Sequence, residues 1–140
     1  LWTAGSGMIG PVVGMGGPSY GGMSADPTNL NTTVIPATKT KAYYVLVADD
    51  PNIIFEVQEI GTGTALDAAA VSLNANLVAG TNNGYISGAL LTNDSEAVTV
   101  GLDVKLLGLS QSVTPNAFGA YAKWRVKINN HLYAVGHVGV

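Results

Sequence analysis

Residues 120–128 read AYAKWRVKI, and this stretch decides the fold class because its side chains alternate strictly in character. Every second side chain is apolar: Ala122, Trp124, Val126 and Ile128. The side chains between them are polar and mostly basic: Tyr121, Lys123, Arg125 and Lys127. A period of two predicts a β-strand with one face in the core. Asn129 and Asn130 suit a two-residue type I′ turn, so a hairpin with residues 131–135 is expected.

Working outward, short segments rich in β-branched and aromatic residues predict further strands at 42–48, 53–59, 85–91 and 97–109. Turn residues at 49–52 predict a hairpin between the first two of these strands. Gly101 and Gly108 are candidates for bulges or bends. Residues 64–79 are the only helical candidate, of three turns at most, with Thr64 as the candidate cap. Asn74 and Asn76 favour a loop at its end. Six or seven strands with almost no helix predict an all-β sandwich or barrel.

The composition narrows the classes of function. The 140 residues include no cysteine, which excludes disulfides and thiolate sites. Only 11% of the residues are charged and the net charge is −3, so no direct nucleic-acid contact is expected. No apolar window is long enough for a transmembrane helix, and no membrane partner is expected. A chain this apolar and this weakly charged is typical of a subunit in an assembly.

The composition also changes near residue 38. Residues 1–38 carry one charge, Asp26, and hold four of the six prolines. They are predicted to form an extended N-terminal Gly/Pro-rich arm, followed by a β domain at 39–140. Ordering about 35 residues costs on the order of 35–70 kcal/mol of backbone entropy, so the arm needs a large apolar contact.

Two arrangements of the arm are open: it orders on a partner, which is favoured, or it wraps its own domain. Its large apolar side chains are the predicted partner contacts: Trp2, Met8, Ile9, Met15, Tyr20 and Met23. A second predicted contact is the basic ladder of Lys123, Arg125 and Lys127. The ladder is interpreted equally well as a solvated face or as a contact with an acidic patch on a partner protein.

Catalytic and ligand-binding motifs lack the context that they require. GSGMIG (5–10) and GPSYG (17–21) match a dinucleotide fingerprint and a nucleophile elbow, but no strand and helix flank them. Asp49, Asp50, Glu56 and Glu59 are considered as a metal or glycosidase site, but their spacing matches no known metal loop. Asp49 and Asp50 are interpreted as turn residues and Glu56 as a solvated strand residue. His131 and His137 have no neighbouring ligands of metal type. We therefore expect no enzyme activity, no metal and no cofactor.

Three segments resemble those of capsid cement, or decoration, proteins of tailed bacteriophages, closest to the podovirus type. They are ADDPNIIFEVQE (48–59), residues 108–109 ahead of PNAFG (115–119), and VKINNHLY (126–133). The resemblance spans about residues 43–135. It implies a jelly-roll-like β-sandwich that binds the outside of an HK97-type capsid as an oligomer.

From this resemblance we expect a structural virion protein on the outer surface of the capsid. Its partners would be the major capsid protein and itself, with a homodimer favoured over a trimer. By bridging neighbouring capsid subunits it would stabilise the DNA-filled head. The alternative is a carbohydrate-binding β-sandwich of a phage tail or surface lectin, with Tyr43, Tyr85 and Tyr121 as candidate sugar contacts.

Overall fold

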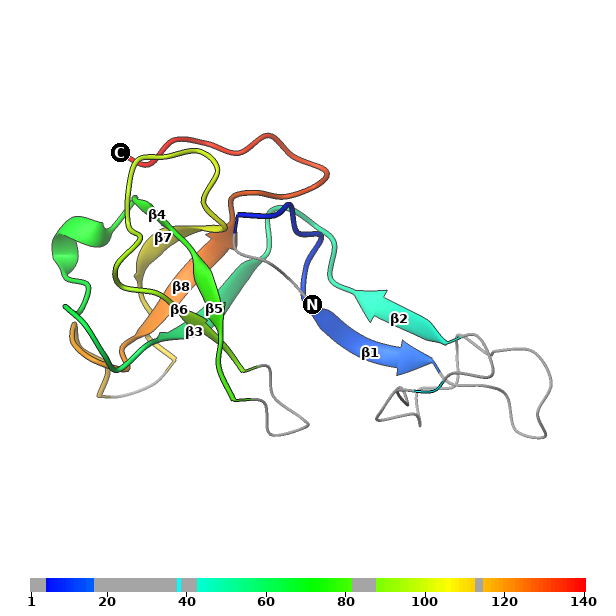
Figure 1. Ribbon diagram of the computed structural model, residues 1–140, viewed down its shortest axis with the longest axis horizontal. Coiled ribbons are helices and arrows are strands. Elements are labelled where there is room, and N and C mark those ends of the chain that lie inside the picture. The colour runs from blue at the N-terminus through cyan, green and yellow to red at the C-terminus, as the bar shows by residue number, and fades with distance from the viewer. Residues whose placement is uncertain (1–4, 17–37, 39–42, 82–87, 113–114) are drawn as a thin grey trace. The chain divides into compact units, whose positions relative to one another are not determined.

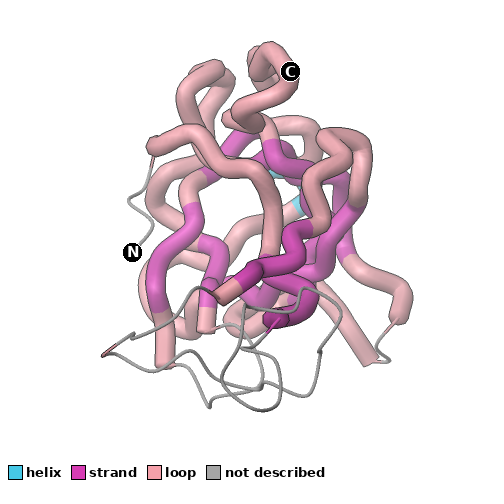
Figure 2. The backbone as a smooth tube through the Cα atoms, turned by 90° about the vertical axis from the view of Figure 1, so that its right-hand side faces the viewer, coloured by secondary structure: helices cyan, strands magenta, loops and turns pink. Residues whose placement is uncertain are grey.

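The computed structural model describes residues 5–16, 38, 43–81, 88–112 and 115–140. They belong to two compact units, a barrel unit (Leu1–Met8 with Pro51–Val140) and a ribbon unit (Ile9–Asp50). Figure 1 labels the strands, and Figure 2 shows them joined by long loops. The described elements are eight strands and one short 3-10 turn, which confirms the prediction of an all-β protein.

The barrel unit contains one sheet of six strands in the order β4-β7-β8-β3-β6-β5. Neighbouring strands are antiparallel except for β3 and β6, which are parallel. The strands are β3 (Ile54–Glu59), β4 (Asn74–Ala75), β5 (Leu77–Ala79), β6 (Ala89–Leu91), β7 (Val104–Leu109) and β8 (Lys123–Ile128). The jelly-roll connection order implied by the resemblance stays a prediction.

The sheet nearly closes on itself because β4 and β5 are the two halves of one bent segment. β4 pairs with β7 and β5 pairs with β6, so the first and last strands of the order are consecutive in the chain. Asn76 lies at the bend, where its N–H donates to Ser95 Oγ at 2.9 Å and its carbonyl accepts from the N–H of Thr92 at 3.0 Å. Closure leaves few free sheet edges, which makes this unit a barrel-like sandwich.

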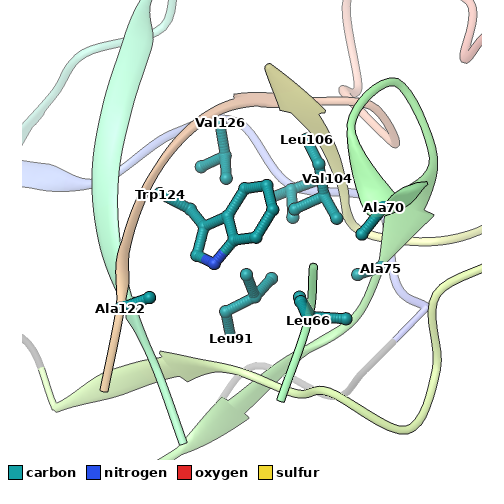
Figure 3. Close-up of a cluster of buried hydrophobic side chains, with 9 residues drawn as sticks. All are labelled: Leu66, Ala70, Ala75, Leu91, Val104, Leu106, Ala122, Trp124 and Val126. Carbon is teal, nitrogen blue, oxygen red and sulfur yellow. The ribbon is translucent and has the colours of Figure 1, made fainter. Parts of the chain in front are cut away.

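The alternation at 120–128 is confirmed by burial. Trp124 is fully buried at the centre of the hydrophobic core, where Figure 3 shows its indole ring surrounded by the other core side chains. The core contains Leu66, Ala70, Ala75, Leu91, Val104, Leu106, Ala122, Trp124 and Val126. β8 reaches this central position because it pairs with β3 on one side and β7 on the other.

Gly108 forms the predicted bulge, with φ +131°. The register between β7 and β8 shifts between Leu106 and Gly108, so that Leu109 lies opposite Trp124. β7 thus has one more residue than β8 between these two pairs, and without it Gly108 would lie opposite Trp124. A shift of one residue would also turn the side chain of Leu109 to the other face of the sheet. The bulge therefore places Leu109 against the core.

The predicted helix at 64–79 is wrong. The structure has a 3-10 turn, η1 (Ala68–Ala70), capped by Asp67 rather than Thr64, and the segment then continues as β4 and β5. The three alanines at 68–70 favour helix locally. Closure of the barrel, however, pairs the following residues with β7 and β6 as strands. Tertiary pairing overrides local propensity here.

Both predicted hairpins are also wrong. The strand at 42–48 appears as β2 (Tyr44–Val47), which pairs with β1 (Val12–Gly16) and not with β3. The stretch 131–135 forms a turn, and His131 makes an isolated parallel bridge with Met8. In each case a segment distant in sequence provides the backbone partner that the adjacent segment was expected to provide.

The ribbon unit is a two-stranded antiparallel sheet of β1 and β2. Gly10 precedes it with φ +157°, and a Cβ there would lie 1.8 Å from the carbonyl oxygen of Ala48. This unit extends to Asp50, beyond the boundary predicted at residue 38. The role of residues 1–38 as an arm stays a prediction.

Candidate functional site

Four of the six lysines and arginines of the chain lie on β7 and β8, and we call them the basic face: Lys105, Lys123, Arg125 and Lys127. On β8 they alternate with the buried residues Trp124, Val126 and Ile128. Lys105 was not predicted, although its position between the apolar residues Val104 and Leu106 is a period-two signal. It lies directly opposite Lys127 in the register of β7 and β8.

Glu56 of β3 neutralises one end of the basic face. Its carboxylate lies 3.7 Å from Lys123 Nζ and accepts hydrogen bonds from the hydroxyls of Ser110 and Ser112. The hydrogen bond from Ser110, then that from Ser112 and the charge of Lys123 lower the pKa of Glu56, against the opposing effect of desolvation. The pair is half exposed, so its ionic part contributes little to stability.

At the other end, two lysines are held by uncharged oxygens. Lys105 Nζ donates to the carbonyl oxygen of Val138 at 3.0 Å, and Lys127 Nζ donates to Asn52 Oδ1 at 3.0 Å. Both lysines line a surface pocket of about 430 Å³. The other lining residues are Pro51, Asn52, Ile128, Asn129, Ala134, Val135 and His137.

Two buried asparagines fix the backbone of His137 beside this pocket. Its N–H donates to Asn129 Oδ1 at 2.9 Å, and its carbonyl accepts from Asn74 Nδ2 at 2.7 Å. The same Asn74 and Asn129 side chains also donate to the carbonyls of Thr99 and Val100. The C-terminal segment is thereby held in place, although the His137 side chain is exposed.

The structure describes only some of the predicted arm contacts. Trp2, Tyr20 and Met23 lie outside the described residues, and only the backbone of Met15, within β1, is described. Ile9 is half-buried. Met8 is partly buried and packs against the hydrophobic core of its own unit. Its predicted contact with a partner stays a prediction.

Residues 5–8 are attached to the barrel unit by several hydrogen bonds. The Met8 N–H donates to the carbonyl of Asn130 at 2.8 Å, and the Met8 carbonyl accepts from the N–H of Leu132 at 2.9 Å. The Gly5 N–H donates to Asp103 Oδ1 at 2.8 Å. This part of the predicted arm therefore packs on its own chain.

Apolar side chains are exposed instead on the ribbon unit, and we call this set the apolar ribbon: Val12, Val13, Val45 and Leu46. Their exposed fractions are 58%, 66%, 45% and 40%. β1 lies within the predicted arm, but none of these four residues was among the predicted contacts. Their aliphatic side chains, three of them β-branched, are the sequence feature from which this pair of strands could have been predicted.

Two buried carboxylates have structural roles that the sequence did not reveal. Glu59 Oε1 accepts from the N–H of Leu66 at 2.9 Å and from Asn93 Nδ2 at 3.3 Å, and Oε2 accepts from Trp124 Nε1 at 3.0 Å. Asp103 accepts from the N–H groups of Gly5 and Leu77. Burial raises the pKa of Asp103, and these two hydrogen bonds act in the opposite direction.

The candidate sugar-binding tyrosines are not brought together by the described geometry. Tyr121 is 63% exposed, Tyr43 is half-buried, and Tyr85 lies outside the described residues. Within the described ranges, no three His, Cys, Asp or Glu side chains are grouped closely enough to hold a metal ion. No helix in the described part of the chain has the length and apolar character needed to span a bilayer.

No family model matches the chain, and no curated protein or solved structure matches it.

Proposed function

We propose that this chain is a structural virion protein that binds the outer surface of an HK97-type phage capsid and cements neighbouring major capsid subunits. The segment resemblance to capsid cement proteins supports this proposal. Two of its segments contain β3 and the C-terminal half of β8, which are neighbouring strands. The proposed role needs an adhesive surface, and the apolar ribbon provides one.

The apolar ribbon is the observation that carries the proposal. A sheet of two strands is marginally stable by itself in water and gains stability when a partner covers one face. Because Val45 and Leu46 are consecutive and point to opposite faces, a partner on one face would bury about half of this set, which would contribute roughly 2–3 kcal/mol. Exposed aliphatic side chains on free strand edges are typical of a surface that another protein covers.

The basic face supplies a second point of attachment in this proposal. Its net positive charge suits an acidic patch on a capsid subunit, and complementary charge accelerates association. When one contact has formed, the second becomes intramolecular, so two modest interfaces give high avidity. A chain that bridges two capsid subunits in this way resists their separation.

The test is binding to purified heads of a tailed phage that carries this gene. We expect Val13→Asp to reduce occupancy about tenfold or more, because a carboxylate in an apolar interface is desolvated without a partner. Val98→Asp is the matched control, since Val98 is 57% exposed on the barrel unit. Equal occupancy of the two variants would refute the role of the ribbon.

The alternative of a carbohydrate-binding module makes a different prediction for the same preparations. If that alternative is correct, the chain binds glycans on an array, fails to sediment with heads, and loses glycan binding in Tyr121→Ala. Sedimentation with heads and no glycan signal supports the cement function.

A further inference from the structure

We infer that the pocket between Lys105, Lys127 and His137 is a binding site for a doubly charged oxyanion of the phosphate type. The site would bind its anion whether or not the chain binds a capsid, although its two lysines also belong to the basic face. It lies at the end of the basic face farthest from Glu56, and every residue that lines it belongs to the barrel unit.

The register of β7 and β8 brings two like charges together. Lys105 and Lys127 lie directly opposite one another on antiparallel strands. Like charges in this arrangement repel each other and destabilise the sheet. At the other end of the face, Lys123 has Glu56 as a counter-ion, whereas the ammonium groups of Lys105 and Lys127 donate to an uncharged carbonyl and an amide oxygen. An anion bound between them would remove this repulsion.

Hydrogen bonds hold both ammonium groups in position beside the pocket. Each ammonium has three donors, and one donor of each is used to fix its position on Val138 or Asn52. The remaining donors are available to a ligand, and the lysine side chains have already lost part of their rotamer entropy. The backbone of His137, which also lines the pocket, is fixed by hydrogen bonds with Asn74 and Asn129.

The size and lining of the pocket also suit a phosphate group. A phosphate group carries a charge of about −1.5 to −2 and three acceptor oxygens, which match two ammonium groups better than one carboxylate does. The pocket volume of about 430 Å³ exceeds that of a free phosphate ion. Ala134 and Val135 form an apolar part of its wall, so a phosphate carried on an organic group also fits.

The experiment is an NMR titration of the ¹⁵N-labelled chain at constant ionic strength. Inorganic phosphate and ribose 5-phosphate are the two probes, and sodium chloride is the reference. We expect both probes to shift the amide signals of Lys105, Lys127 and His137. Tighter binding of ribose 5-phosphate would identify a phosphate ester as the ligand, and equal binding would identify the free ion.

Three variants distinguish phosphate binding at this pocket from a general effect of positive charge on the Kd. Lys105→Gln and Lys127→Gln should each raise the Kd for phosphate about tenfold or more, the effect of losing one charge-assisted hydrogen bond. Arg125→Gln removes the same charge from the same face outside the pocket and should change the Kd less than about twofold.

The inference is overturned if Arg125→Gln weakens binding as much as the two lysine variants, or if phosphate produces no shifts beyond those of chloride. Should Lys127→Gln fail to fold, Lys127→Arg keeps the charge and should keep phosphate binding. Loss of binding in a folded Lys127→Arg variant, with Lys105→Gln unaffected, would also contradict the site.

Discussion

At the scale of single residues, Glu59 shows how a buried carboxylate can be held without a cation. Three donors from distant parts of the chain converge on it, namely the Leu66 N–H, Asn93 Nδ2 and Trp124 Nε1. Each hydrogen bond to a charged acceptor is worth about 1.5–3 kcal/mol, and together they offset the cost of desolvating the charge. Glu59 thereby fixes the orientation of the central Trp124.

Glu59→Gln should lower the free energy of unfolding by about 2–4 kcal/mol, because the amide NH₂ would face one of these donors and leave it unsatisfied. Urea denaturation followed by circular dichroism measures the loss. Glu96→Gln, at an exposed position, should change stability by less than about 0.5 kcal/mol. A Glu59→Gln variant as stable as the parent would mean that the donors do not hold the charge.

Glu56 should make stability depend on pH in the acidic range. Its pKa is lowered in the folded state, chiefly by the hydrogen bond from Ser110, so folding favours the ionised form. The stabilisation is present above the ordinary glutamate pKa and is lost as the pH falls through the lowered value. The stability difference between parent and Glu56→Gln should therefore be largest near about pH 7 and shrink towards about pH 3. A difference that stays constant with pH would contradict this assignment.

Asp103 should act with the opposite sign. Burial raises its pKa, so the folded state binds a proton more readily than the unfolded state does. Its contribution to stability falls as the pH rises from the ordinary aspartate pKa through the raised value. Replacing it in Asp103→Asn should remove this decline, although the variant also loses an acceptor for Gly5 or Leu77. Denaturation curves across the same pH series distinguish the two carboxylates by the sign of their slopes.

At the scale of elements, the β1–β2 ribbon depends on a close approach of two backbones. A Cβ on Gly10 would overlap the carbonyl oxygen of Ala48, next to the hydrogen bond from the Ala48 N–H to the Pro11 carbonyl at 3.1 Å. The neighbouring atom belongs to the backbone, so rotation of a side chain cannot relieve the overlap. The start of the ribbon therefore requires glycine.

Gly10→Ala should separate the strands at this end, and hydrogen exchange of the Ala48 amide should accelerate as its hydrogen bond is lost. Gly101→Ala is the matched control, because a Cβ at Gly101 meets no atom within 4 Å. Unchanged exchange of Ala48 in Gly10→Ala would show that the strands tolerate the added atom.

At the scale of the whole molecule, the barrel unit is stabilised by closure around one core. Leu91 of β6 is fully buried beside Trp124, and its strand pairs with both β3 and β5. The removal of its side chain leaves a cavity that closed strands cannot easily fill. A packing defect there should therefore affect the whole unit.

Leu91→Ala should reduce the free energy of unfolding by about 3–5 kcal/mol. Val135→Ala, at a position 84% exposed, should cost less than about 0.5 kcal/mol. Thermal and urea denaturation of both variants test this expectation. A small effect of Leu91→Ala would indicate that the strands collapse into the cavity, and hence that closure is looser than the pairing suggests.

Local sequence pattern was sufficient to predict that the chain forms strands and which side chains lie on each face of β8. Alternation is a local property, so the burial of Trp124 and Val126 and the exposure of Arg125 could be predicted from neighbouring residues alone. The bulge at Gly108 could be predicted for the same reason, since it depends on one residue that tolerates positive φ. The basic ladder followed from the same alternation.

Which strands pair and which side chains come into contact depends on the complete tertiary structure. Backbone donors and acceptors are chemically alike in every strand, so a sequence pattern does not distinguish β1 from β3 as the partner of β2. For the same reason, the closure through residues 74–79 could not be predicted, and Lys105 could not be placed opposite Lys127. Long-range pairing is selected by the free energy gained when the common core is buried, and this free energy depends on the entire fold.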